Sequence, residues 1–450
     1  MCAKRPRTPP TSTPINTNIN AVLFSLAVCL GILFTIAPYL APCFVDFLLL
    51  PTTTTTLLLH RASVSVCSYR VASAIPFARR FCSNSKLQFS SRAGSRTMAS
   101  GGAYARERRV AELAVQRAAV LTRAVYSSRV KGTVTKSDAS PVTIADFGAQ
   151  ALVFSALDKS FPSDNIIGEE DSADLRENND LSSLVWDAVS TALSASPGHE
   201  SDLGSVTGQG QMLEFIDKGG HTDSATGRVW ALDPVDGTKG FLRGGQYAIA
   251  LALLVDGVVQ VGVLGCPNLP GLNEGEEGVL LSAIRGQGTV VKPLSGDLDA
   301  AEPRKTTMNA ITVASEGGFC EGVESGHSAH DVQARIAGKL GITKAPVQLD
   351  SQAKYASIAL GRGEIYLRLP TKMTYEEKIW DHAAGSLVVG EAGGVVADMY
   401  GRPLDFTVGR TLRENKGVIA MPRQIAEEVK KAVLDVAVEH YGPPPPKSSL

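Results

Sequence analysis

Acidic residues are nearly missing from the first hundred positions of this chain, and cysteine is scarce in the rest. Asp46 is the one acid up to residue 100, against ten Lys and Arg, whereas 34 bases face 44 acids beyond that point. A body this acidic argues against a nucleic-acid-binding surface and suits clustered carboxylates that hold cations. The body keeps only Cys266 and Cys320, with no CxxC pair, which argues against a disulfide scaffold or a zinc site.

The basic leader, residues 1–100, does not read as part of an enzyme fold and is expected to be mostly disordered. Its apolar run from Ala21 to about Leu40 is just long enough to span a bilayer. The stretch Arg61–Arg96 is rich in Ser and Arg and has no acid, a composition that suits a transit peptide. The leader is therefore a signal anchor, a targeting segment or a mis-assigned start. A start at Met98 predicts a cytoplasmic enzyme, and a real leader predicts a mitochondrial or membrane-anchored one.

Helices open the acidic body, and strands follow them. Apolar residues recur at three- and four-residue steps over Tyr104–Val130, and a second helix is predicted over Thr143–Ser160 with Thr143 as a possible N-cap. Residues 172–227 are polar and irregular and are interpreted as an insertion around one helix. Two apolar strands joined by Asp256-Gly257 then predict a hairpin, because this dipeptide favours a tight turn. They are Gln246–Val255 and Val258–Gly265.

The body is predicted to be an α/β protein of two lobes. An N-terminal α+β lobe, residues 101–302, carries most of the candidate metal ligands. The sequence turns polar, with Gly, Pro and Ser, around residues 286–308. Strands and helices then alternate from a predicted strand at Ala310–Ala314, which indicates a C-terminal α/β lobe over residues 303–440. A proline-rich tail, residues 441–450, is expected to be disordered.

A nine-residue segment beginning at Trp230, Trp-Ala-Leu-Asp-Pro-Val-Asp-Gly-Thr, places two carboxylates after a strand. The strand delivers Asp233 to its end, and Pro234 prevents the chain from continuing in the sheet. Asp236 follows three residues on, so that both carboxylates and the carbonyl of Val235 can point into one small volume. Hard oxygen ligands in this arrangement suit Mg²⁺.

The last two residues of this segment, Gly237 and Thr238, complete the turn. Glycine allows a tight conformation, and both residues would offer backbone N–H groups to a phosphate oxygen. Taken alone, the segment also reads as an Asp-Pro turn followed by a solvated Asp-Gly, since both dipeptides are common.

Three more segments contribute candidate acids. Glu169 follows a strand predicted at Asn165–Gly168, and strand ends are places where a sheet positions catalytic residues. Asp381, in Trp-Asp-His-Ala-Ala-Gly, is expected at the N-cap or in the first turn of a helix. Asp146 lies near the start of the second helix. Each of these acids, taken alone, also fits a solvated loop, a helix cap or a surface acid in a first turn.

Together and in this order, the segments resemble the inositol monophosphatase superfamily over about residues 104–440. The resemblance implies a layered αβαβα sandwich and a magnesium-dependent phosphatase that binds two or three ions. It makes Asp146 and Thr238 the pair that polarises the attacking water. It also assigns the metal ligands, with Val235 contributing its carbonyl: Glu169, Asp233, Val235, Asp236 and Asp381. No Cys or His nucleophile motif is present, so no phosphoenzyme is expected.

Several stretches resemble the 3′(2′),5′-bisphosphate nucleotidases within this superfamily. They are Ser140–Gln150, Thr238–Gly244, Gly326–His330, Leu349–Tyr355, Tyr366–Pro370 and Lys378–Asp381. That resemblance assigns the contacts to the nucleotide or its 5′-phosphate to His327, Ser351, Lys354 and Arg368. Lys354 and Arg368 are suitable cations for a second phosphate remote from the metals.

The resemblance also implies the reaction. The expected substrate is adenosine 3′,5′-bisphosphate (3′-phosphoadenosine 5′-phosphate), which would lose its 3′-phosphate to give AMP and phosphate, as in sulfate assimilation. Activity on 3′-phosphoadenylyl sulfate stays open, and inhibition by Li⁺ is expected. The expected protein is a monomer that binds no nucleic acid and contacts a membrane only if the leader is retained.

Other functions remain open at this point. An inositol polyphosphate 1-phosphatase or an inositol monophosphatase would share the metal site, and only the surface of His327, Lys354 and Arg368 separates these from a nucleotidase. A catalytically silent nucleotide sensor would be marked by a lost ligand, and none is lost in this sequence. The full set of five acids also argues against a membrane-anchored scaffold.

Overall fold

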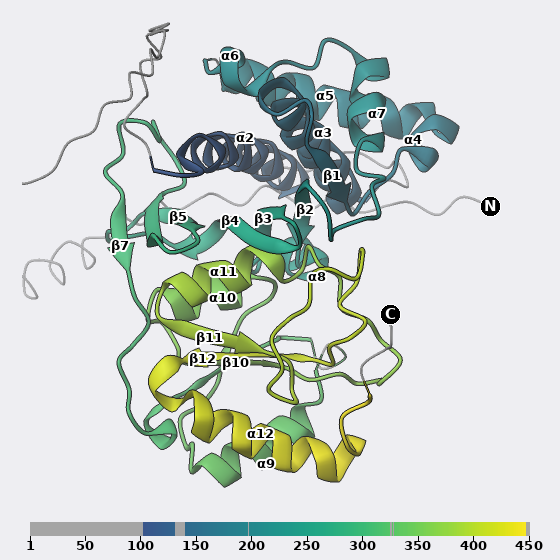
Figure 1. The fold of residues 1–450 in the computed structure, drawn as a ribbon. Coiled ribbons are helices and arrows are strands. Elements are labelled where there is room, and N and C mark those ends of the chain that lie inside the picture. The colour runs from purple at the N-terminus through teal and green to yellow at the C-terminus, as the bar shows by residue number, and fades with distance from the viewer. Residues whose placement is uncertain (1–101, 131–139, 197, 325, 327, 447–450) are drawn as a thin grey trace, which may run out of the picture. The chain divides into compact units, whose positions relative to one another are not determined.

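The structure is a computed structural model, and it describes residues 102–130, 140–196, 198–324, 326 and 328–446. The predictions about the leader, His327 and the end of the tail lie outside the described residues. All described elements belong to one unit, Gly94–Leu450 (Figure 1). In the part of the chain that is described, no helix is long and apolar enough to cross a membrane.

Helices and two sheets alternate in five layers (Figure 1). The helices are α2 Ala105–Val130, α3 Pro141–Ser160, α4 Ala173–Glu177, α5 Asn179–Ala195, α6 Glu200–Leu203, α7 Gln209–Asp217, α8 Thr238–Arg243, α9 His330–Leu340, α10 Ala353–Ala359, α11 Ala383–Glu391 and α12 Ala426–Tyr441. The strands are β1 Asn165–Gly168, β2 Arg228–Asp236, β3 Ala248–Val255, β4 Val258–Pro270, β5 Glu277–Ile284, β6 Gly288–Pro293, β7 Arg304–Thr306, β8 Phe319–Glu321, β9 Val347–Gln348, β10 Ile365–Arg368, β11 Gly394–Ala397 and β12 Val418–Pro422.

The first sheet contains seven strands in chain order, β1 to β7. β1 runs parallel to β2, and the other neighbours are antiparallel. β3 is buried along almost its whole length, which explains its continuous apolar sequence, because a sheet covered on both faces needs no polar side. Asp256 and Gly257 both have positive φ, 49° and 72°, as tight hairpin turns require. The predicted hairpin is confirmed.

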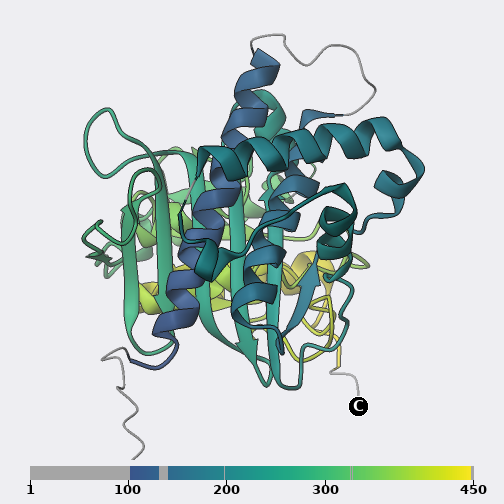
Figure 2. The ribbon, with the colours of Figure 1, turned by 90° about the horizontal axis from the view of Figure 1, so that it is seen from above.

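Helices cover both faces of this sheet. α2 and α3 lie over the strands on one face (Figure 2), and α10 and α11 pack on the other. A Cβ added to Gly262 of β4 would lie 2.8 Å from the carbonyl oxygen of Ala384 in α11. The backbones of β4 and α11 therefore approach closely, which glycine at position 262 allows.

The second sheet contains five strands in the order β11-β12-β10-β8-β9. β10 is parallel to β8 and antiparallel to β12. α9 and α12 bury an apolar core against its outer face, to which Phe319, Ile336, Ile419 and Val433 contribute. The layers thus run helix, sheet, helix, sheet, helix, and the expected αβαβα fold is confirmed (Figure 1).

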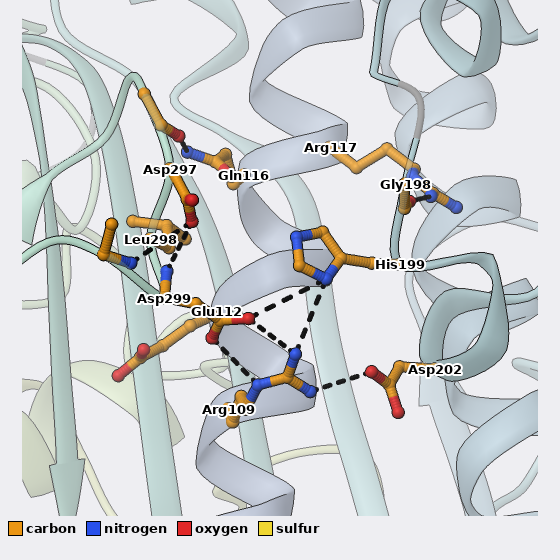
Figure 3. A network of polar contacts seen from close by, with 12 residues as sticks. Arg109, Glu112, Gln116, Arg117, Gly198, His199, Asp202, Asp297, Leu298 and Asp299 are labelled. Atoms are coloured by element: carbon orange, nitrogen blue, oxygen red, sulfur yellow. Dashed lines mark hydrogen bonds and ion pairs between the residues drawn. The ribbon is translucent and has the colours of Figure 1, made fainter.

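Residues 172–227 were interpreted as an insertion around one helix. The described part of this segment contains four helices, α4 to α7, and it contacts α2. Arg109 of α2 forms ion pairs with Asp202 of α6 at 2.8 Å and with Asp299 at 2.6 Å (Figure 3). Arg117 of α2, largely buried, donates a hydrogen bond to the carbonyl of Gly198 at 3.1 Å. These contacts hold the segment on the helical layer above the first sheet.

Some predicted boundaries are wrong. α3 begins at Pro141 with Ser140 as its N-cap, not at Thr143, because proline suits the first helical position, where no N–H partner is needed. Ala310–Ala314 is not a strand. The N–H of Ala314 donates to the carboxylate of Glu428 and not to a neighbouring strand. β12 and α12 were not predicted. β7 lies past the predicted lobe boundary at residue 302, yet it pairs with β6 of the first sheet, which therefore extends to Thr306. The two-lobe division at residue 302 stays a prediction.

Candidate active site

A cavity of about 500 Å³ lies beside the C-terminal end of β2. Ten of the twelve predicted site residues line it: Glu169, Asp233, Val235, Asp236, Gly237, Thr238, Ser351, Lys354, Arg368 and Asp381. Asp146 is not among the lining residues, and His327 lies outside the described residues. The fold therefore gathers every predicted metal ligand at one cavity, although these ligands come from three separate segments of the chain.

The end of β2 presents Asp233 and Asp236 because the strand becomes irregular there. The register between β2 and β3 shifts between these two residues, at Pro234, which has no N–H for the ladder. Gly237 follows with φ 92°, and a Cβ at this position would lie 2.7 Å from the Cβ of Ser351. The turn therefore requires glycine, both for its backbone conformation and for its close approach to another segment.

Glu169 follows β1, and the backbone of the next residue, Glu170, is held by Gln150 of α3. The N–H of Glu170 donates to Gln150 Oε1 at 3.1 Å, and its carbonyl accepts from Gln150 Nε2 at 2.7 Å. A Cβ at Gly168 would lie 2.6 Å from the ring of Phe154. Glycine is thus needed for β1 to pack against α3, and this packing fixes the direction in which Glu169 leaves the sheet.

Asp381 precedes α11, but it does not cap the helix. The N-cap is His382, so the prediction of an N-cap or first-turn position is wrong. Gln352 takes part of the capping role: its Oε1 accepts from the N–H of Gly385 at 3.2 Å, and its Nε2 donates to the carbonyl of Trp380 at 2.9 Å. The Asp381 side chain is left to line the cavity.

The acids of the cavity raise one another's pKa. Burial raises the pKa of Asp233 well above its usual value, and Glu169, Asp236 and Asp381 add to the effect. Burial also raises the pKa of Asp236, against the lowering effect of Lys354. Glu169 is exposed as a residue, yet loss of water around its carboxylate raises its pKa too, with Asp236 adding to it. The cluster therefore resists holding its full negative charge without a cation.

A divalent cation fits this donor set. Asp233 Oδ1 is buried and has no hydrogen-bond partner among the described residues, although a buried carboxylate oxygen normally has one. Asp236 keeps one oxygen for the N–H of Gln352, at 2.5 Å. The remaining carboxylate oxygens, with the carbonyl of Val235, are hard ligands of the kind that Mg²⁺ prefers.

Asp146 lies in the second turn of α3, near Glu169 and Glu170. It is 8% exposed, so the alternative of a surface acid in the first turn is wrong. Burial raises its pKa well above the usual value, and Glu170 and Glu169 add to this. Thr238 is exposed at the start of α8 and lines the cavity. No hydrogen bond joins Asp146 and Thr238 in the described part of the chain, so their role as a pair stays a prediction.

Two cations face the acids, Lys354, which is buried, and Arg368, which is partly buried. Lys354 is 6% exposed, donates to the carbonyl of Leu349 at 3.2 Å and lies over the ring of Tyr366. Burial lowers its pKa to about 8, although Asp236 opposes this. Arg368 Nη2 lies 3.5 Å from Asp381 Oδ2. Arg368 is thus adjacent to a predicted metal ligand, and its role toward a second phosphate stays a prediction.

Glu377, which pairs with Arg368 in this cavity, was not predicted from the sequence. Glu377 Oε2 lies 2.8 Å from Arg368 Nε and 3.1 Å from His382 Nε2, and His382 Nδ1 is 2.9 Å from the hydroxyl of Tyr355. Burial would raise the pKa of Glu377, but Arg368 and His382 together lower it to about 2. Its sequence context, Tyr-Glu-Glu-Lys, reads as a solvated loop, so only its closeness to the Asp381 motif could have drawn attention to it.

Comparison with known proteins shows the family of the chain. The family model described as "Inositol monophosphatase family" matches residues 105–436. The chain belongs to the inositol monophosphatase family. Members of this family are generally magnesium-dependent phosphatases, so the expectation of a phosphatase is confirmed.

Curated relatives share most of the chain. One is the 3′(2′),5′-bisphosphate nucleotidase of Emericella nidulans, 52% identical over 348 residues, covering 74% of this chain and 99% of the relative. Another is the enzyme of the same name from Schizosaccharomyces pombe, 50% identical over 339 residues, covering 73% and 95%. The 3′,5′-bisphosphate nucleotidase 2 of Arabidopsis thaliana is 39% identical over 348 residues, covering 73% and 96%.

Solved structures are more distant. Mycobacterium tuberculosis SuhB is 20% identical, covers 74% of this chain and 97% of its own, and gives a TM-score of 0.45. The membership in the inositol monophosphatase family therefore depends on the family model and the curated relatives.

Proposed function

We propose that this member of the inositol monophosphatase family removes the 3′-phosphate of adenosine 3′,5′-bisphosphate and releases AMP and phosphate. The observation that carries the proposal is the composition of the cavity, which holds a cluster of carboxylates beside two cations, the buried Lys354 and the partly buried Arg368. A substrate with two phosphates can place one at each kind of group. The names of the relatives, 3′(2′),5′-bisphosphate nucleotidase, support this choice.

The carboxylates would hold Mg²⁺ near the phosphate that leaves. The proposed ligands are Glu169, Asp233, Asp236, Asp381 and the carbonyl of Val235. Bound Mg²⁺ would supply positive charge against the phosphate and activation of the attacking water. In the described residues these ligands do not form one compact group, whereas Glu377, Asp381 and His382 have ligand atoms within 4.8 Å of one another. The number of ions, two or three, is proposed from the resemblance to the family.

Asp146 and Thr238 would orient the attacking water. The raised pKa of Asp146 fits a carboxyl that accepts or holds a proton in this cavity. Gly237 and Thr238 would direct backbone N–H groups to an oxygen of the same phosphate, because the tight turn at Gly237 brings that backbone to the cavity wall. No covalent intermediate is needed for this reaction.

The second phosphate and the nucleoside would lie on the cationic side. Arg368 offers a planar guanidinium whose fork matches phosphate oxygens, and Glu377 holds it in place. Lys354 adds a second positive charge, and Ser351 lies at the wall between the cations and the turn at Gly237. His327 keeps its proposed contact with the nucleotide on the strength of the sequence alone.

Other parts of the proposal concern the whole protein. We expect a monomer that acts on a small molecule, binds no nucleic acid, and contacts a membrane only if residues 1–100 are retained. Translation from Met98 would give a cytoplasmic enzyme, and retention of the leader would give a mitochondrial or membrane-anchored one. Activity on 3′-phosphoadenylyl sulfate belongs to the same proposal, because this compound carries the same 3′-phosphate.

The test is phosphate release by the full chain in Mg²⁺. Adenosine 3′,5′-bisphosphate, inositol 1-phosphate and inositol 1,4-bisphosphate are compared, with and without Li⁺ or EDTA. We expect a strong preference for the nucleotide and loss of release in EDTA and Li⁺. Preference for an inositol phosphate would keep the metal site and overturn the roles of Lys354 and Arg368. Release from none of the three would favour a silent nucleotide sensor.

A further inference from the structure

Arg410 donates the hydrogen bonds of its guanidinium to backbone carbonyls, one of which belongs to the residue before Glu169. Nη2 donates to the carbonyl of Gly168 at 2.5 Å, and Nη1 donates to the carbonyls of Gly219 at 2.9 Å and His221 at 3.1 Å. Its central carbon lies 4.8 Å from the centre of the Trp380 ring. In the described part of the chain Arg410 forms no ion pair, so the side chain has an unusual set of partners for a cation.

These contacts join two segments that carry proposed metal ligands. The carbonyl that receives the shortest hydrogen bond belongs to the residue before Glu169, and the stacked ring belongs to the residue before Asp381. The backbone carbonyl of Arg410 also accepts from the N–H of Ile379 at 3.1 Å. One residue therefore contacts both segments, although Glu169 and Asp381 are far apart in the sequence.

The surroundings of Arg410 are themselves held in place. Ser224 Oγ donates to the carbonyl of Phe406 at 2.6 Å and receives the N–H of Gly409 at 3.0 Å. On the other side of Glu169, Gln150 holds the next peptide through two hydrogen bonds. Side chains thus hold the carbonyl before Glu169 and the peptide after it, and loss of Arg410 would remove the side-chain partner of that carbonyl.

We propose that Arg410 is a positioning residue that sets the affinity of the site for divalent cations by holding Glu169 and Asp381 at a fixed separation. The inference rests on the proposed function of these two acids as metal ligands. Arginine suits the task because its planar fork donates in several fixed directions at once, whereas lysine offers a single ammonium on a flexible stem. Groups that orient metal ligands in this way control metal affinity without touching the metal.

The test compares Arg410→Met with the unaltered full chain. Calorimetric titration of the metal-free protein with MgCl₂, without substrate, should show binding weakened by about 10- to 100-fold, the usual cost of removing a group that orients a ligand. The Mg²⁺ concentration for half-maximal phosphate release should rise by the same factor. At saturating Mg²⁺, KM for the nucleotide should stay close to that of the unaltered protein. Arg410→Lys should fall between the two proteins.

Arg362 provides the matched control. It also donates to two backbone carbonyls, those of Pro270 at 2.7 Å and Gly271 at 2.9 Å, and neither adjoins a proposed ligand. Arg362→Met should lower Tm without weakening Mg²⁺ binding. Unchanged Mg²⁺ binding in Arg410→Met, or equal weakening in Arg362→Met, would overturn the inference. Should Arg410→Met fail to fold, Arg410→Lys carries the same comparison.

The two proposals can fail separately. An unaltered protein that binds Mg²⁺ but releases phosphate from no substrate would refute the proposed reaction, and the calorimetric comparison would still decide the role of Arg410. An active protein whose Mg²⁺ affinity is the same with and without Arg410 would refute only the positioning role.

Discussion

Replacing Asp381 with asparagine should make the metal-free protein more stable at pH 8 while it removes the activity. Burial raises the pKa of Asp381 from 3.8 to about 8, although Arg368 opposes the rise. A carboxyl with a raised pKa stabilises the fold while it is protonated. This contribution is complete below the unfolded pKa of 3.8 and is lost as the pH rises to about 8.

The size of the effect follows from the same shift. Each pH unit corresponds to about 1.4 kcal/mol, so the full shift amounts to on the order of 5 kcal/mol at pH 8. Asparagine has nearly the same shape and no charge to bury. We therefore expect Asp381→Asn to raise the free energy of unfolding by about 2–5 kcal/mol at pH 8, with a much smaller gain at pH 5.

The measurement is Tm by circular dichroism in EDTA from pH 5 to pH 8. Tm of the unaltered protein should fall as the pH rises, and Tm of Asp381→Asn should fall less. Asp180→Asn, a change at an exposed acid in the first turn of α5, should leave the slope of the unaltered protein in place. Adding Mg²⁺ at pH 8 should raise Tm of the unaltered protein by more than that of Asp381→Asn, which lacks one proposed ligand. Lower stability of Asp381→Asn at pH 8 in EDTA would refute the reasoning.

Three further substitutions test the same cavity. Asp233→Asn should abolish phosphate release in Mg²⁺ without a change in the circular dichroism spectrum, and near-normal turnover would contradict the metal-site assignment. Arg368→Ala should raise KM for the nucleotide by about 10- to 100-fold, since hydrogen bonds to charged groups contribute about 1.5–3 kcal/mol; steady-state kinetics with a nucleotide and an inositol phosphate would show whether the loss is specific. Glu377→Gln should lower the free energy of unfolding at pH 7 by about 3 kcal/mol, because the pKa of Glu377 is depressed to about 2. That stability is present above the unfolded pKa of 4.5 and is lost as the pH falls to about 2, so urea unfolding at pH 7 and pH 3 should show a smaller difference at the lower pH.

Features that depend on neighbours in the sequence could be predicted. Asp256-Gly257 specified its hairpin because both residues accept positive φ. The turn after Asp233 could be predicted for the same reason, since Pro234 and Gly237 constrain the backbone by themselves. Residue identity and spacing were enough there, and the five layers of the fold followed from the resemblance that these segments carry.

Features that depend on distant segments could not be predicted. Asp381 was expected to cap α11, but Gln352 supplies capping contacts from another segment. Glu377 looks like a loop acid until Arg368 and His382 are seen beside it. Arg410 has no motif at all, because its partners are carbonyl oxygens, which every residue has. Such roles become visible only when the two sheets are packed together.

The arrangement of the proposed ligands has a consequence for the synthesis of the protein. Glu169, which follows β1, and Asp233 and Asp236 of β2 leave the ribosome long before Asp381 is made. During that interval the acids of the first sheet have neither Lys354 nor Arg368 beside them, and a growing chain folds from its N-terminal part first. The nascent protein therefore carries an incomplete cluster of negative charge that becomes a catalytic site only near the end of translation, so a chain truncated before residue 381 would be both inactive and poorly able to retain Mg²⁺.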